Sequence, residues 1–399
     1  MTGLPATIDG EARSRPRVLV LNASGRIEGD INTVLMLLRH SRGELDYLVV
    51  SQPGGAVHSA LGELPGIELR AMQMGGERDF QTRRRGGPLR HLIAALQAAA
   101  AIVRLCWLVR RERVECVYTI DRGVAPKLAV AVSKLTGCPF VLCAAYPFYA
   151  GNGPSCRYVL RHVTKLHVHS EYLRYYLAPY VLNPGKFVII PNGIDVDQFN
   201  PENRGVEVRR SHGLSSDDHV VAMTGRLNEF KGQDDLIVAA QDVLDGYPNT
   251  YFLIAGRGDF EETLKAMIER MCLDEHVRLV GYVESLESFI GAADIMVMPS
   301  REEPFGLVAL EALAMAKPLV ATRAGGVPEF VIDGEVGVLV APQDPSGLAA
   351  AIISLLKDRD RAAALGAKGR QHVERSYSAQ LYAKRVVDLL AAVARPTGR

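Results

Sequence analysis

The stretch that decides the fold is SREEPFGLVALEALAMAKPLVATRAGGVPE, residues 300–329. It follows a short apolar run and contains a turn with proline and glycine, a helical segment, and a second apolar run. A strand, a helix and another strand in this order predict one unit of a parallel sheet. In open sheets of this kind ligands bind at the carboxyl ends of the strands. The turn Pro304–Gly306 is therefore expected at a binding site.

Working outward, similar short runs recur along the whole chain. They are rich in Val, Ile and Leu and lack strict alternation, which is typical of strands covered on both faces. The predicted strands are Val18–Leu21, Tyr47–Val50, Cys116–Ile120, Phe140–Cys143, Leu166–Val168, Val188–Ile190, Val220–Thr224, Tyr251–Ala255, Val277–Val280, Ile295–Met298, Leu319–Ala321 and Val338–Val340. Because so many strands would be unusual in one sheet, we expect two sheets of about six. The predicted fold class is α/β, with two Rossmann-like doubly wound parallel-sheet domains facing across a cleft.

The domain join is predicted where the strand ending at Ile190 runs into the turn residues Pro191–Asp195. The expected organisation has a flexible tail, an acceptor-binding domain, a linker, a donor-binding domain and a closing helix that packs back across the join. Their predicted limits are residues 1–16, 17–190, 191–214, 215–375 and 376–399.

Composition excludes several classes of protein. The 399 residues are 48% hydrophobic and 23% charged, an ordinary globular balance, and the formal net charge of +1 gives no field that would attract nucleic acid. Six cysteines occur without a Cys-x-x-Cys pair, which favours reduced thiols over a zinc site or a disulfide framework. The polar start of the chain does not resemble a signal peptide. We therefore predict a cytoplasmic protein.

One apolar run, Leu92–Val109, is interrupted by Gln97 and Arg104 and falls short of the ~20 residues that a membrane span needs. Arginines flank it on both sides: Arg78, Arg83, Arg84, Arg85 and Arg90 before it, Arg110, Arg111 and Arg113 after it. Two interpretations stay open. The region is either a long surface helix beside a solvated basic loop, or a patch that contacts anionic lipid or an anionic acceptor, which would place the protein at the inner face of the membrane.

Two cations follow the predicted strand Val220–Thr224. After Gly225 come Arg226 and, five residues later, Lys231, just before a predicted helix. Both can converge on one diphosphate near a helix N-terminus, although isolated cations in such a loop are often ordinary surface residues.

The glutamates Glu303 and Glu311 have seven residues between them, with the turn and the helix start in the middle. Carboxylates suit the hydroxyl groups of a sugar and of ribose. The backbone amides of Phe305, Gly306 and Leu307 are left without partners at the helix start, which suits a phosphate. Together with the two cations, this predicts a site for an activated sugar.

Weaker signals surround this set. The backbone at Val283, after the strand ending near Val280, is expected to face a nucleobase edge. In the first domain, Gly29 follows the first strand, Asp121 ends the third, and Tyr146 opens a loop after the fourth, where all three are candidate acceptor contacts. Asp121 is better explained as a capping residue, whereas Tyr146 is equally well explained as loop packing.

Other motifs point away from alternative chemistries. Gly256-Arg257-Gly258 lacks the third glycine of a dinucleotide fingerprint, which disfavours a nicotinamide dehydrogenase. His167 and His169 alternate on a strand and are interpreted as buried, hydrogen-bonded residues. No metal site is predicted, and neither a Gly-x-Ser-x-Gly elbow nor a Walker loop is present.

As an ordered set, these motifs resemble the retaining glycosyltransferases of family four, which have the GT-B fold. The resemblance rests on Gly225-Arg226 with Lys231-Gly232, on Glu303 and Glu311, on Gly325–Glu329, and on the junction Ile190–Asp195. It implies transfer of a sugar from a nucleotide diphosphate donor, preferably a UDP-sugar, to an acceptor hydroxyl, with retained anomeric configuration and no metal or other cofactor.

By that resemblance Arg226 and Lys231 neutralise the leaving diphosphate, Glu303 and the amides after it hold the donor sugar and phosphate, and Glu311 holds the ribose. The acceptor implied is a small molecule, a glycan or a lipid-linked sugar. Many members carry a histidine where this chain has Ala145-Tyr146. The alternatives are a nucleotide-sugar epimerase or hydrolase on the same fold and a non-catalytic nucleotide-sugar binding protein; oligomeric state is left open.

Overall fold

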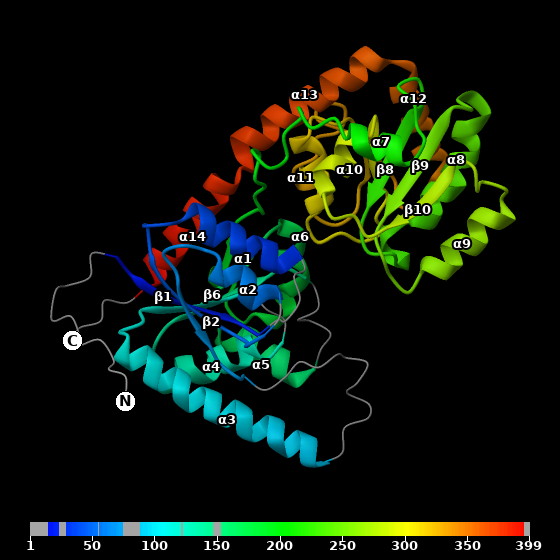
Figure 1. The fold of residues 1–399 in the computed structure, drawn as a ribbon. Helices are drawn as coiled ribbons and strands as arrows, with labels where there is room; N and C mark the ends of the chain where they lie inside the picture. Colours follow the sequence, from blue (N-terminus) through cyan, green and yellow to red (C-terminus); the bar gives the residue numbers. More distant parts are fainter. Residues whose placement is uncertain are drawn as a thin grey trace. The chain divides into compact units, whose positions relative to one another are not determined.

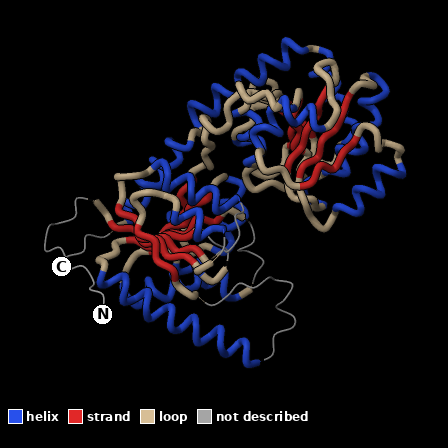
Figure 2. The backbone as a smooth tube through the Cα atoms, viewed as in Figure 1, coloured by secondary structure: helices blue, strands red, loops and turns tan. Residues whose placement is uncertain are grey.

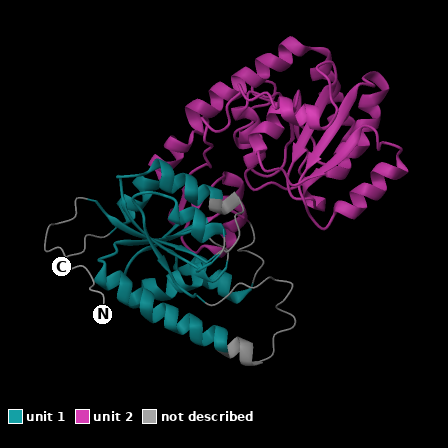
Figure 3. Ribbon diagram, viewed as in Figure 1, with its two compact units in different colours: residues 1–143, 153–166, 386–399 teal, residues 144–152, 167–385 magenta. Residues whose placement is uncertain are grey.

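The computed structural model describes residues 15–23, 29–54, 56–74, 88–120, 123–146 and 153–394, and of residues 29–31 and 88–92 it describes the backbone alone. The described chain forms two compact units, coloured separately in Figure 3. Unit 1 comprises residues 1–143, 153–166 and 386–399, and unit 2 comprises residues 144–152 and 167–385. The sequence-based domain limits, with a join after residue 190, stay a prediction.

Within the residues that the structure describes, the first sheet has seven strands in the order β3-β2-β1-β4-β5-β6-β7. The bounds are β1 Arg17–Asn22, β2 Asp46–Ser51, β3 Glu68–Ala71, β4 Cys116–Thr119, β5 Phe140–Ala144, β6 Lys165–Val168 and β7 Phe187–Ile189. Strand β1 pairs in parallel with both β2 and β4, so the strand order reverses between β1 and β4.

The second sheet has six parallel strands in the order β10-β9-β8-β11-β12-β13. They are β8 His219–Thr224, β9 Thr250–Ala255, β10 Val277–Gly281, β11 Ile295–Met298, β12 Leu319–Thr322 and β13 Val338–Val340. Here the order reverses between β8 and β11, which pair directly.

Helices alternate with the strands and cover both faces of each sheet (Figures 1 and 2). Their bounds are α1 Gly29–His40, α2 Ala56–Gly62, α3 Pro88–Arg111, α4 Ala125–Thr136, α5 Pro154–His162, α6 Glu171–Leu177, α7 Val206–Ser211, α8 Gln233–Gly246, α9 Glu261–Arg270, α10 Leu286–Ala292, α11 Leu307–Ala314, α12 Pro345–Lys357, α13 Arg359–Ser376 and α14 Ala379–Val393. In the first sheet α1 and α2 lie on one side, and α3, α4 and α5 lie on the other (Figure 1).

The core of unit 2 shows why its strands are apolar throughout. Along β8, Val220 and Ala222 point into a core that includes α10 and α11, whereas Val221 and Met223 point into a second core with α8 and α12. Both faces of the strand are therefore buried, and alternation with polar residues is excluded. This confirms the predicted fold class of two doubly wound parallel sheets.

All twelve predicted strands are present, and the structure adds β3, which the sequence analysis missed. Strand β3 has the sequence ELRA, lies at the edge of its sheet, and is only partly buried. An edge strand is partly exposed to solvent and can carry charged residues. Its sequence therefore lacks the continuous apolar run by which the other strands were recognised.

The two strand histidines are buried, as interpreted from the sequence. His167 Nε2 and His169 Nδ1 lie 3.0 and 3.1 Å from the carbonyl oxygen of Ile190. Burial lowers the pKa of His169 to about 4 and that of His167 well below its usual value. Neutral rings that share one carbonyl acceptor give both residues a structural role.

Candidate active site

The candidate site lies where the strand order of the second sheet reverses. Strands β8 and β11 are neighbours, with Val221 opposite Ile295 and Ala222 opposite Met296. The loops that leave their carboxyl ends carry the predicted donor residues. Brought to one edge of the sheet, the two loops flank the position where doubly wound sheets bind ligands.

The loop after β8 is shaped by glycine. Gly225 has a φ of +152° and Gly232 a φ of +71°. A Cβ at Gly232 would lie 2.2 Å from the carbonyl oxygen of Pro299, so this glycine lets the two loops touch. Gln233, buried at the start of α8, donates to the carbonyl oxygen of Arg226 at 2.9 Å. These contacts hold the loop that carries both predicted cations.

Lys231 and Glu303 form an ion pair between the two loops. Lys231 Nζ donates to Glu303 Oε2 at 2.5 Å, and Ser300 Oγ donates to the same oxygen at 3.3 Å. The Glu303 side chain is 10% exposed and that of Lys231 is 26% exposed. A buried carboxylate thus fixes the lysine while part of the lysine still faces solvent. Arg226, on the same loop, is exposed.

Glu311 is the fifth residue of α11, one turn into the helix. Its Oε2 is buried and has no hydrogen-bond partner among the described residues. Burial raises the pKa of this carboxyl to about 7, against the opposing effect of the Lys231 charge. A buried carboxylate oxygen without a partner costs free energy in the unliganded protein, and a ligand hydroxyl would satisfy it.

The N-terminus of α11 faces the same loops. Its N-cap is Gly306, with a φ of +107° and no side chain to accept hydrogen bonds from the first amides. A Cβ at Gly306 would lie 3.2–3.4 Å from Met298, Val327 and Glu303, so a larger residue would crowd the turn. Phe305 is buried and stacks on Phe330, with ring centroids 4.9 Å apart. The helix start is therefore held rigidly, with its amides available to an anion.

Two further glycine motifs let neighbouring loops approach this site. A Cβ at Gly325, which has a φ of +54°, would lie 1.9 Å from the carbonyl oxygen of Glu303. A Cβ at Gly256 would lie 1.8 Å from the carbonyl oxygen of Gly225, and one at Gly258 would lie 2.0 Å from that of Leu227. The Gly256–Gly258 pair thus serves loop packing in this chain.

Glu329, the last residue of the Gly325–Glu329 motif, caps α6. Its carboxylate accepts hydrogen bonds from the amides of Glu171 and Tyr172 at 2.7 and 2.8 Å. Ser170, the N-cap of α6, donates to the carbonyl oxygen of Pro304 at 2.7 Å. The loop that holds Glu303 is therefore tied to the start of α6, a link that no local sequence pattern indicates.

The remaining predicted contacts are less defined. Val283 follows β10 and packs against the core of unit 2 through a half-buried side chain. Gly29 is the first residue of α1, and Tyr146 is half-buried just after β5. Asp121 lies outside the described residues. The roles assigned to all these residues from the sequence stay predictions.

Sequence reasoning missed Arg301, which connects the two loops. Its guanidinium donates to Asp234 Oδ2 at 2.7 Å, to Asp235 Oδ1 at 2.9 Å and to the carbonyl oxygen of Glu229 at 2.8 Å. Its own amide donates to the carbonyl oxygen of Phe230 at 2.7 Å. The aspartates lie in the first turn of α8, far from Arg301 in the chain. An arginine directly before a glutamate pair was the only signal available.

We expect Arg301→Ala to lower the free energy of unfolding by about 2 kcal/mol, because two largely buried carboxylates lose their cation. Donor affinity should fall as well, since the loop that carries Lys231 loses its anchor. Urea denaturation and calorimetric titration with nucleotide measure both effects. Arg323→Ala is the matched control: it breaks an exposed pair with Asp333 and should cost less than about 1 kcal/mol. Equal stability losses in both variants would contradict the assignment.

Comparison with known proteins identifies the family to which this chain is related. The family model for glycosyl transferases group 1 matches residues 206–372. A GDP-mannose-dependent monoacylated alpha-(1-6)-phosphatidylinositol monomannoside mannosyltransferase of Corynebacterium glutamicum is 31% identical over 309 residues, or 72% of this chain and 79% of the relative. A D-inositol 3-phosphate glycosyltransferase of Corynebacterium urealyticum is 34% identical over 221 residues, about half of each chain.

Solved structures show the same fold. Anabaena Alr3699/HepE in complex with UDP aligns with a TM-score of 0.78 at 19% identity, over 94% of this chain and all of that one. A glycosyltransferase from Rickettsia africae aligns with a TM-score of 0.78 at 20% identity, over 95% of this chain and 99% of that one. The chain belongs to the group 1 glycosyl transferases, the glycosyltransferases of family four with the GT-B fold, and it is an enzyme that transfers a sugar from a nucleotide-sugar donor.

Proposed function

We propose that this enzyme transfers a hexosyl group from a nucleoside diphosphate hexose to an acceptor hydroxyl with retained anomeric configuration and without a metal ion. The single observation that carries the proposal is the convergence of Lys231, Glu303, Glu311 and the α11 N-terminus at the reversal point of the second sheet. All four belong to unit 2.

The loop after β8, which carries Arg226 and Lys231, binds the diphosphate of the donor. Departure of the nucleoside diphosphate develops negative charge, and Lys231 is already fixed by the Glu303 carboxylate at 2.5 Å. The exposed Arg226 supplies a second cation on the same loop. Cations and helix amides that are positioned in advance stabilise such charge without reorganising, which is the role a metal ion has in other transferases.

The two carboxylates hold the neutral parts of the donor. Glu303 orients the sugar beside the amides of Phe305, Gly306 and Leu307, and the unpartnered Oε2 of Glu311 accepts from a ribose hydroxyl. GDP-mannose is the first donor candidate, because a relative that covers 72% of this chain is named for it. A UDP-sugar, preferred from the sequence, is the second. Val283 is the proposed backbone contact to the base.

The proposed reaction breaks the bond between the anomeric carbon and the diphosphate oxygen and forms a new bond from the acceptor oxygen on the same face. The acceptor proton passes to the departing phosphate, so no protein nucleophile is required. Gly29, Asp121 and Tyr146 are the proposed acceptor contacts. The acceptor class is a lipid-linked sugar or a small polyol phosphate, because relatives are named for phosphatidylinositol monomannoside and inositol phosphate. A location at the inner membrane surface follows for a lipid-linked acceptor.

A donor panel tests the proposal. Purified protein is incubated with GDP-mannose and UDP-hexoses, with and without EDTA, in the presence of inositol phosphate or phosphatidylinositol mannoside. We expect one donor to be consumed only with an acceptor, equally in EDTA, and the product to keep the anomeric configuration by NMR. Acceptor-independent turnover would assign the site to an epimerase or hydrolase, and tight donor binding without turnover on any acceptor would assign it to a binding protein.

A further inference from the structure

Helix α3 exposes an apolar stripe along its length. Ile93, Leu96, Val103 and Trp107 are 46, 61, 69 and 52% exposed. Their spacing of three, seven and four residues places them on one helix face. The opposite face is buried in unit 1, with Leu105 and Leu108 at 0 and 2% exposed. A helix on the surface of a globular domain normally carries polar residues on its solvent face.

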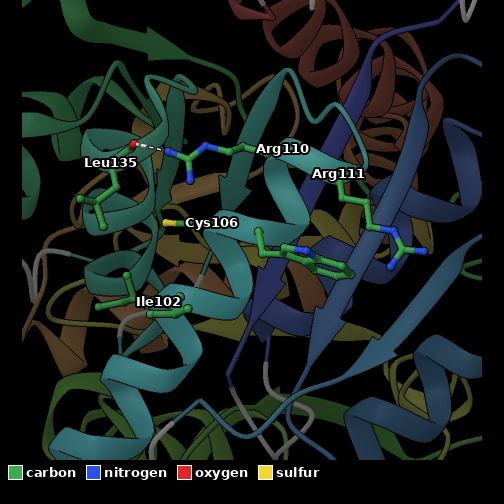
Figure 4. A pocket seen from close by; sticks show the side chains of 7 residues that line it. Ile102, Cys106, Arg110, Arg111 and Leu135 are labelled. Atoms are coloured by element: carbon green, nitrogen blue, oxygen red, sulfur yellow. Dashed lines mark hydrogen bonds between the residues drawn. The ribbon is translucent and has the colours of Figure 1, made fainter.

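A groove lies beside the stripe. An open pocket of about 620 Å³ is lined by Ile102, Val103, Cys106, Trp107, Arg110, Arg111 and Leu135 (Figure 4). Leu135, at the end of α4, is 61% exposed. Arg110 donates to its carbonyl oxygen at 3.0 Å, and the Arg111 guanidinium lies 4.7 Å from the centre of the Trp107 ring. Apolar walls with guanidinium groups at one end suit an amphiphile with an anionic head.

The helices on this side of the sheet carry charge of a single sign. Helices α3, α4 and α5 lie together there (Figure 1), and they hold eight arginines and lysines but no aspartate or glutamate. The formal net charge of the whole chain is only +1, so the remainder is acidic on balance. Such an asymmetry orients the protein against an anionic surface.

We propose that the α3 face, made of Ile93, Leu96, Val103, Arg104, Trp107 and Arg111, docks onto the surface of an anionic lipid bilayer. The apolar side chains enter the interfacial region, where tryptophan is favoured, and the arginines contact lipid phosphates. A second copy of the chain is a poorer occupant, because two such faces would bring like charges together.

The apolar run Leu92–Val109 was expected from the sequence to fall short of a membrane span, but helix residues 93–111 are long and apolar enough to cross a membrane by length and composition alone. The burial of Leu105 and Leu108 against the domain instead places α3 along the membrane surface. The proposal concerns a surface of unit 1, separate from the donor residues of unit 2.

Vesicle binding tests the proposal with a built-in probe. Trp107 is the single tryptophan of the chain, so its fluorescence reports on this face alone. The full chain is mixed with vesicles of phosphatidylcholine alone or of phosphatidylcholine with phosphatidylglycerol. We expect co-sedimentation and a blue shift of the emission with the anionic vesicles only, both weakened by salt.

The double variant Val103→Asp, Arg104→Glu keeps Trp107 and replaces an apolar and a basic side chain of the α3 face with acidic ones. The variant changes the charge of the face by three units, and each unit near an anionic membrane changes partitioning about fivefold, so it should bind on the order of 100-fold more weakly. The matched control is Leu182→Asp, Arg210→Glu, which alters an apolar residue 77% exposed and an arginine side chain 77% exposed in unit 2. It should bind like the original chain.

Several results would overturn the proposal. They are equal binding to both kinds of vesicle, no binding to either, and unchanged binding of the Val103→Asp, Arg104→Glu variant. Self-association that this variant abolishes, without vesicle binding, would assign the face to a second copy. Resistance to alkaline carbonate extraction would show that α3 crosses the bilayer. The vesicle experiment contains neither donor nor acceptor. A negative result would therefore leave the proposed transfer reaction unaffected, and the donor panel tests that reaction separately.

Discussion

Lys231→Ala should lower kcat/KM by about 10²–10³-fold, equivalent to ~2.7–4 kcal/mol of transition-state stabilisation, as for loss of one fixed donor to a developing anion. The structure fixes Lys231 against the buried carboxylate of Glu303, with Nζ and Oε2 2.5 Å apart. Its charge is therefore already in place when the diphosphate departs. Steady-state transfer assays with the donor identified by the panel measure the effect.

Two further variants separate catalysis from folding. Lys231→Met keeps the apolar stem of the side chain and should be as inactive as Lys231→Ala, with less disturbance of packing. Lys265→Ala removes a lysine that is half exposed and pairs with Glu261 and Glu262 on α9, so activity should stay within about twofold. Full activity of Lys231→Met in a folded protein would refute the assigned role.

Glu311→Leu should have opposite effects on stability and on binding. A buried carboxylate oxygen without a partner destabilises the free protein, so an apolar residue of similar size should raise the free energy of unfolding by about 1–3 kcal/mol. Donor binding should weaken about 10–100-fold, since hydrogen bonds to a charged acceptor are each worth about 1.5–3 kcal/mol. Denaturation of the free protein and calorimetry with the nucleotide diphosphate measure the two effects. A destabilised variant with unchanged nucleotide affinity would make Glu311 a structural residue.

The pH dependence provides an independent check on Glu311. Its pKa is raised to about 7 in the folded protein, above the ordinary value of 4.5. Between these values the native state keeps a proton that the unfolded state releases, so this group makes stability fall as pH rises through that window and level off above pH ~7. The slope is at most about 1.4 kcal/mol per pH unit. Relative to Glu311→Gln, which does not titrate, the original chain should lose stability from pH 5 to pH 7. A constant difference across that range would contradict the burial of the ionised group.

The strands could be predicted from the sequence because their apolar pattern lies within a few consecutive residues. In runs such as Val220–Thr224 consecutive residues are apolar. The two cores on either side of β8 explain why apolar and polar residues do not alternate there. Strand β3 was missed because its sequence, ELRA, has the mixed character of an edge. The closing helix, expected within residues 376–399, is present as α14, Ala379–Val393.

Contacts between residues that are distant in the chain could not be predicted from the sequence in this way. Arg301 meets Asp234 and Asp235 only because β11 lies beside β8, and the cap that Glu329 places on α6 joins residues more than 150 positions apart. The apolar stripe of α3 has the same spacing as a buried stripe. Exposure, which distinguishes a docking surface from a core, depends on which elements cover it.

By itself, the sequence determined the alternation of strands and helices, the two sheets, and the residue types at the ends of β8 and β11, because hydrophobic periodicity and turn chemistry act over a few residues. Only the tertiary structure decided that Lys231 pairs with Glu303, that Glu311 keeps an unsatisfied oxygen, and that Trp107 faces solvent. The physical reason is that pairing and burial depend on strand order and on packing between segments distant in the chain, and neither is encoded in the spacing of neighbouring residues.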